Sequence, residues 1–159
     1  MRKIILIIVL LSSFVNFAQT GDAKVDKMLK ELKEQQNSKA SISFTFNKKT
    51  YKDKASFMET DKKTFSIGTS LLSEKLMTTQ IGLIVDAKKS GTYTIATGNK
   101  NSSVVNINGT YYEFAGTVNL VVKGKKVSGT FTGELYEIKK GKSKPDAKSS
   151  GKVSGSFTE

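Results

Sequence analysis

The segment Lys126–Glu134 reads KVSGTFTGE, and the segment Lys152–Glu159 reads KVSGSFTE. In both segments Val, Gly and Phe occupy every second position and Ser or Thr fills the positions between them, which is the two-residue period of a strand with one buried face. A glycine between two large inward-facing residues leaves room for an aromatic ring from a neighbouring strand, or for the close approach of another backbone. The two segments therefore predict two matching strands, and the second is expected to be an integral strand rather than a tail.

The residues before the first copy predict its partner strand. Val118, Leu120 and Val122 alternate, and the turn at 123–126 follows them. If Val122 pairs with Val127, Leu120 faces Gly129 and Val118 faces Phe131, so the apolar residues of both strands lie on one side. The alternation thus predicts a hairpin with a defined register.

Asn108–Gly109 marks a second hairpin, because this dipeptide favours a two-residue type I′ turn. Pairing Ile107 with Thr110 places Val105 opposite Tyr112, and both then face the core. A third hairpin is expected between 81–85 and 93–95, which also alternate.

Ile42, Phe44 and Phe46 begin the β region, and the polar stretch 47–54 is interpreted as a lysine-rich turn. Two further strands are expected near 57–58 and 65–67. In total, the sequence predicts roughly eight to ten short strands joined by hairpins, which is typical of an antiparallel sandwich or barrel. The predicted fold class is therefore mainly β, a single antiparallel β-sandwich or barrel.

The N-terminal region has a different pattern. Residues 1–18 have a positive start, an apolar run and a small residue, Ala18, before the expected cleavage site, which is the pattern of a secretory signal peptide. Residues 19–40 are expected to form one amphipathic helix packed on the β domain, and 41–159 form that domain. Helical spacing is shown by Val25, Met28, Leu29 and Leu32. The protein is thus expected to be exported, to the periplasm or outside the cell, with no membrane span after cleavage.

The formal net charge is +12, and every basic residue except Arg2 is a lysine. Lysine lacks the planar fork with which arginine recognises bases and phosphates, so no sequence-specific nucleic-acid binding is expected. A coat of lysines keeps a protein soluble, and it also attracts anionic lipid or polysaccharide in a salt-sensitive way.

The sequence has no histidine and no cysteine, which removes the commonest general base, the thiolate nucleophile and the soft metal ligands. No catalytic motif or calcium loop is present. No catalytic residue, cofactor or metal site is therefore predicted, and a carboxylate-based hydrolase is the third and least favoured hypothesis.

The repeated SGT-F pattern, the related SGTYTI at 90–95 and the signal peptide together resemble the small secreted β-sandwich domains of unknown function found in Gram-negative bacteria. The resemblance covers about residues 90–159. It implies the fold and export, and it implies no chemistry.

Two functional hypotheses remain open. The first is a secreted, non-catalytic surface or interaction module, whose candidate contact residues are Tyr111, Lys139, Lys140, Lys142 and Lys144. The second is lipocalin-like binding of a small apolar ligand inside the β domain. Its candidate cavity residues are Phe44, Phe46, Tyr112, Phe114, Phe131 and Phe157. A pocket of several hundred cubic ångströms lined by Phe and Ile, roughly the size of known ligand sites, distinguishes the two, and its absence favours the first hypothesis.

Overall fold

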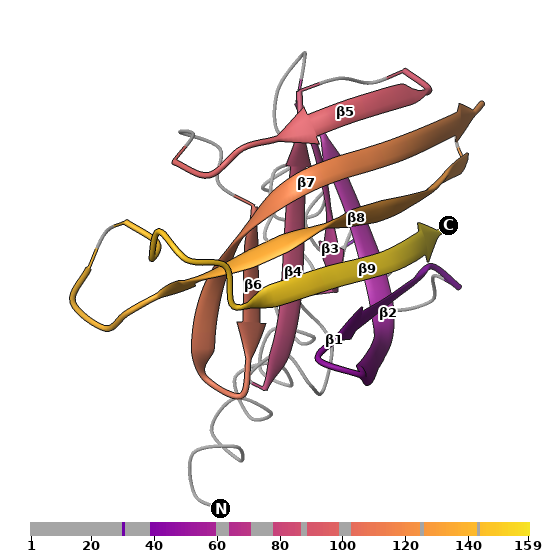
Figure 1. Cartoon of the computed structure of the whole chain (residues 1–159). Helices are drawn as coiled ribbons and strands as arrows, with labels where there is room; N and C mark the ends of the chain where they lie inside the picture. The colour runs from indigo at the N-terminus through magenta and orange to yellow at the C-terminus, as the bar shows by residue number, and fades with distance from the viewer. Residues whose placement is uncertain are drawn as a thin grey trace, which may run out of the picture. The chain divides into compact units, whose positions relative to one another are not determined.

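The computed structural model describes residues 30, 39–59, 64–70, 78–86, 89–98, 103–124, 126–142 and 144–159 (Figure 1). The chain divides into two units, Met1–Asn37 and Ser38–Glu159, and the description below concerns the second. The predicted signal peptide lies outside the described residues, as does the predicted helix 19–40 apart from residues 30, 39 and 40.

The described part of the second unit contains nine strands. They are β1 (Ser41–Phe46), β2 (Lys49–Glu59), β3 (Phe65–Thr69), β4 (Thr79–Val85), β5 (Gly91–Ile95), β6 (Val104–Ile107), β7 (Thr110–Lys123), β8 (Lys126–Ile138) and β9 (Gly151–Thr158). The mainly β fold class predicted from the alternation is confirmed.

Eight of these strands close into an antiparallel barrel. Their order is β7-β6-β4-β3-β2-β1-β9-β8, and β8 pairs back onto β7. Apart from β5, strands that follow one another in the chain pair with one another, and the first strand, β1, pairs with the last, β9, so the barrel is an up-and-down barrel. Figure 1 shows β7, β8 and β9 side by side, as their pairing requires. Of the two architectures that the sequence left open, the structure is the barrel.

The two copies of the repeat form the neighbouring strands β8 and β9, and each accommodates the other. Their antiparallel register places Gly129 opposite Phe157 and Phe131 opposite Gly155. A Cβ atom on Gly129 would lie 2.6 Å from Cζ of Phe157, and one on Gly155 would overlap the ring of Phe131. The glycine of each copy therefore makes room for the phenylalanine of the other, so the neighbouring ring for which the sequence predicts room comes from the other copy.

The predicted register of β7 and β8 is also confirmed, because Val122 pairs with Val127 and Val118 pairs with Phe131. At the β6–β7 hairpin Ile107 pairs with Thr110. Asn108 and Gly109 have φ angles of 52° and 84°, as a type I′ turn requires.

The predicted hairpin between 81–85 and 93–95 is wrong. β5 pairs with β7 along Gly116–Leu120, whereas β4 pairs with β3 and β6. The physical reason is length: β6 covers only the first four residues of β7, from Thr110 to Glu113, and β5 pairs further along the same edge. Alternation shows which face of a strand is buried, but it does not identify the partner strand.

The predicted turn at 47–54 is too long. Only Asn47 and Lys48 form the turn, with φ angles of 48° and 64°, and β2 begins at Lys49. Residues 49–54 pair with all six residues of β1.

Among the described residues, aromatic and aliphatic side chains pack inside the barrel, which is one of the two arrangements known for eight strands. Phe114 and Phe131 are fully buried and meet edge to face with ring centroids 6.0 Å apart. The ring centroids of Phe157 and Phe57 lie 6.1 Å apart, and those of Phe46 and Tyr112 lie 5.5 Å apart.

Candidate functional site: a pocket at the barrel mouth

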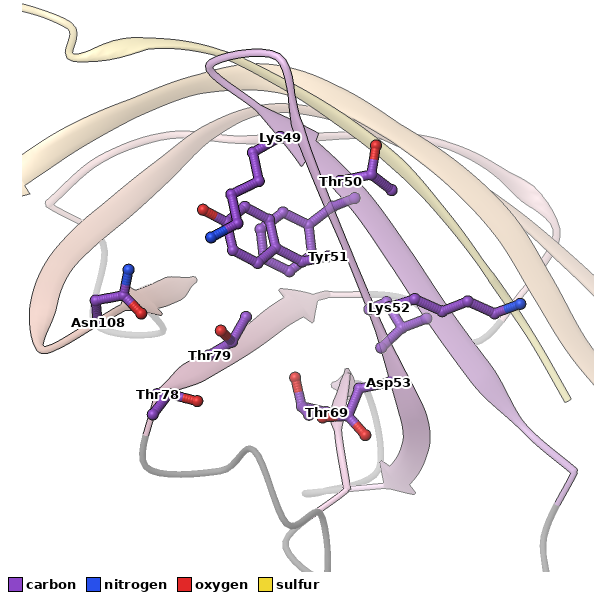
Figure 2. Close-up of a pocket in the computed structure, with 11 residues that line it drawn as sticks. Lys49, Thr50, Tyr51, Lys52, Asp53, Thr69, Thr78, Thr79 and Asn108 are labelled. Atoms are coloured by element: carbon purple, nitrogen blue, oxygen red, sulfur yellow. The ribbon is translucent and has the colours of Figure 1, made fainter.

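A pocket of about 340 Å³ opens among the described residues between the first half of β2, the start of β4 and the β6–β7 turn (Figure 2). We call this end of the barrel the mouth. The residues lining the pocket are Ile42, Phe44, Lys49, Thr50, Tyr51, Lys52, Asp53, Thr69, Thr78, Thr79 and Asn108. Its volume lies near the lower end of the range of small-molecule pockets, about 300–1,000 Å³.

β2 supplies the polar side chains on one side of the pocket. Its pairing with β1 sets Lys49 opposite Phe46, Tyr51 opposite Phe44 and Asp53 opposite Ile42. Directly paired residues share a face of the sheet, so these three β2 residues lie on the inward face. Thr50 and Lys52 alternate with them, and Figure 2 shows their side chains pointing away from Lys49 and Tyr51.

An aromatic pair forms the apolar part of the wall. The rings of Phe44 and Tyr51 stack with centroids 4.9 Å apart and planes 20° apart. The ammonium nitrogen of Lys49 lies 5.3 Å from the centroid of the Tyr51 ring, within the range of a cation–π contact. Lys49 is exposed and Tyr51 is half-buried, so this corner of the pocket is open to ligand.

The facing side is built from hydroxyl and amide groups. Thr78, Thr79 and Asn108 lie across from Tyr51 in Figure 2. The backbone N–H of Asn108 donates to the carbonyl of Thr78 at 2.6 Å, which joins the β6–β7 turn to the start of β4. This bond fixes the two rim segments relative to each other.

Two further polar groups have hydrogen bonds of their own. The hydroxyl of Thr69 is buried and accepts the backbone N–H of Ile81 at 2.9 Å. The carboxylate of Asp53 accepts the backbone N–H of Lys54 at 2.7 Å. Thr69 and Asp53 are therefore held in place before any ligand arrives.

Tyr112 lies beside this region. Burial raises the pKa of its phenol above the ordinary value, and the nearby Glu137 carboxylate and Tyr51 raise that pKa further, while a hydrogen bond with Thr110 lowers it. Tyr112 therefore stays neutral at physiological pH.

The six residues predicted to line an apolar cavity have different positions. Phe44 lines the mouth pocket. Phe46 and Tyr112 contact each other, and Phe114, Phe131 and Phe157 are buried in the packed core.

The predicted surface residues are exposed. The side chain of Tyr111 is 50% exposed and its backbone pairs with Asn106. Lys139, Lys140, Lys142 and Lys144 are exposed in the loop after β8. Within that loop Lys139 forms an ion pair with Asp146 at 2.8 Å, and this contact raises the pKa of Lys139. Binding by these residues stays a prediction.

Glu113 on β7 has a structural contact of its own. Its side chain is 3% exposed, and its carboxylate accepts the backbone N–H of Gly98 at 2.7 Å. Glu113 fastens the turn after β5 to the outside of the barrel.

Sequence reasoning missed Lys49, Tyr51, Asp53 and Thr79 as site residues. The available signal was Asn47, because an Asn that begins a two-residue turn after the strand 41–46 implies a returning strand from residue 49. With that strand in place, every second residue from Lys49 faces inward.

Within the described ranges no cluster of three or more Asp or Glu residues is arranged to hold a metal ion. No helix in the same ranges is long and apolar enough to cross a membrane. Comparison with protein-family models, with the curated proteins and with the solved structures found no match for this chain.

Proposed function

We propose that this chain is a non-catalytic binding module that holds a small molecule at the mouth of its β-barrel. The observation that carries the proposal is the pocket of about 340 Å³, whose wall combines Ile42 and the stacked Phe44–Tyr51 pair with a larger number of polar side chains. Such a combination is typical of small-molecule sites, where apolar surface gives affinity and polar groups give orientation.

The filled interior supports a site at the mouth rather than deep in the barrel. Phe114, Phe131 and Leu135 are fully buried inside it. A ligand there would have to displace packed rings, which costs several kcal/mol of core packing, about 3–5 for one phenylalanine. The lipocalin-like hypothesis is therefore kept in a changed form, with the ligand bound at one end of the barrel.

Export is part of the proposal. It is supported by the signal-peptide pattern of residues 1–18 and by the resemblance of residues 90–159 to secreted β-sandwich domains. The absence of histidine and cysteine from the sequence supports a binding role over a catalytic one.

The test is native mass spectrometry of the protein recovered from its exporting cells, to find a small molecule that copurifies. Thr79→Trp places a large ring in the pocket and is expected to abolish the added mass. Thr94→Trp is the matched control, because Thr94 is exposed on β5 and is not part of the pocket wall. An added mass that persists in Thr79→Trp would contradict the proposed site.

A further inference from the structure

We infer that the ligand of the mouth pocket is an anion with an uncharged, partly flat body, and that Lys49 binds its anionic group. This inference rests on the proposed function, since it names the chemical class of the ligand for the same site.

The ammonium group of Lys49 is available for an anion. It forms no ion pair with any of the described residues, and its nitrogen lies 5.3 Å from the centroid of the Tyr51 ring. A cation–π contact at an exposed position is weaker than a charge-assisted hydrogen bond to a carboxylate. An anion that enters the pocket therefore gains a better partner for Lys49 than the one it has in the free protein.

The pocket wall next to Lys49 determines the shape and polarity of the uncharged part of the ligand. Ile42 and Phe44 are almost fully buried, and with Tyr51 they line one side of the pocket. A flat, apolar group covers such a surface with little loss of conformational entropy. Thr79 and Asn108 on the facing side are suited to neutral polar groups, because they carry no charge.

The net charge of +12 attracts anions to the protein as a whole, so the preference is assigned to Lys49 by comparing the Lys49→Met variant with a control that loses the same charge elsewhere.

The experiment compares three indole compounds that share the ring and differ in the charge and chemistry of the side-chain end group: indole-3-acetate, indole-3-acetamide and tryptamine. Affinities are measured by isothermal titration calorimetry on the full chain at low salt. Indole-3-acetate is expected to bind at least about tenfold more tightly than the neutral amide, and tryptamine most weakly.

Lys49→Met is expected to bring the affinity for indole-3-acetate down to that for the amide, while Lys49→Arg keeps the preference. Lys126→Met is the matched control: it removes the same charge, but Lys126 is exposed at the β7–β8 turn, at the other end of β7 from the mouth. It should leave the preference intact.

The outcomes separate the two proposals. Equal affinities for the acetate and the amide in the unmodified protein, or a preference that survives in Lys49→Met, would contradict the anionic ligand class alone. Absence of binding by all three compounds would contradict the small-molecule pocket itself.

Discussion

Gly129 and Phe157 show at the scale of single residues how the repeat specifies the barrel. Each lies in one copy of the repeat, and the antiparallel register sets them face to face. The repeated segment is complementary to itself, because reversing the direction of one copy brings its glycine to the phenylalanine of the other. Gly155 and Phe131 form the reciprocal pair, in which the second copy supplies the glycine and the first copy supplies the phenylalanine.

The pair makes a prediction about glycine substitutions. Gly129→Ala would place a methyl group 2.6 Å from Cζ of Phe157 and against the backbone carbonyl of Asn119, so it should lower the free energy of unfolding by about 1–3 kcal/mol. Gly82→Ala is the control, because the nearest atom to its new methyl group is 3.9 Å away. Urea denaturation of both variants measures the difference, and equal stabilities would show that the ring is not packed on Gly129.

At the scale of elements, β9 closes the barrel. It pairs with β1 on one edge and with β8 on the other, so its removal leaves two strands with unpaired edges. Exposed edges pair with other chains and promote aggregation.

We therefore predict that deleting 152–159 abolishes the cooperative thermal transition and yields aggregated protein. The point variant Phe157→Ala should lower the free energy of unfolding by about 3–5 kcal/mol, because the ring is 2% exposed. Ser156→Ala, at an exposed outward position of the same strand, should have little effect. A deletion variant that stays monomeric and melts like the full chain would contradict the role given to β9.

The elements that the sequence predicts well are those whose inward residues are apolar. The register of β7 with β8 could be read from Val118, Leu120 and Val122, because each has an apolar residue or glycine opposite it. The first half of β2 could not be found in this way, since Lys49, Tyr51 and Asp53 occupy its inward positions. Polar residues at inward positions of β2 remove the apolar–polar alternation by which a strand is predicted. The same residues line the pocket, so the part of β2 that is hardest to predict belongs to the candidate site.

On the scale of the whole barrel, the interior and the mouth have different roles. Packed rings and aliphatic side chains fill the interior and stabilise the closed sheet, whereas the mouth leaves a pocket beside a stacked Phe44–Tyr51 pair. The sequence predicts a sandwich or a barrel and does not decide between them. The barrel is closed by the pairing of β9 with β1, which joins the two ends of the described β region, and such a distant pairing has no local sequence signal.

The central claim is that a small ligand binds at the mouth and not on the lysine-rich outer surface. The most direct measurement is mapping of backbone amide chemical shifts in ¹⁵N-labelled protein during titration with indole-3-acetate. We predict shifts concentrated at Lys49, Tyr51, Thr79 and Asn108, and none at Tyr111 or the loop lysines. Shifts concentrated at Tyr111 and Lys139–Lys144, with the mouth unchanged, would contradict the claim.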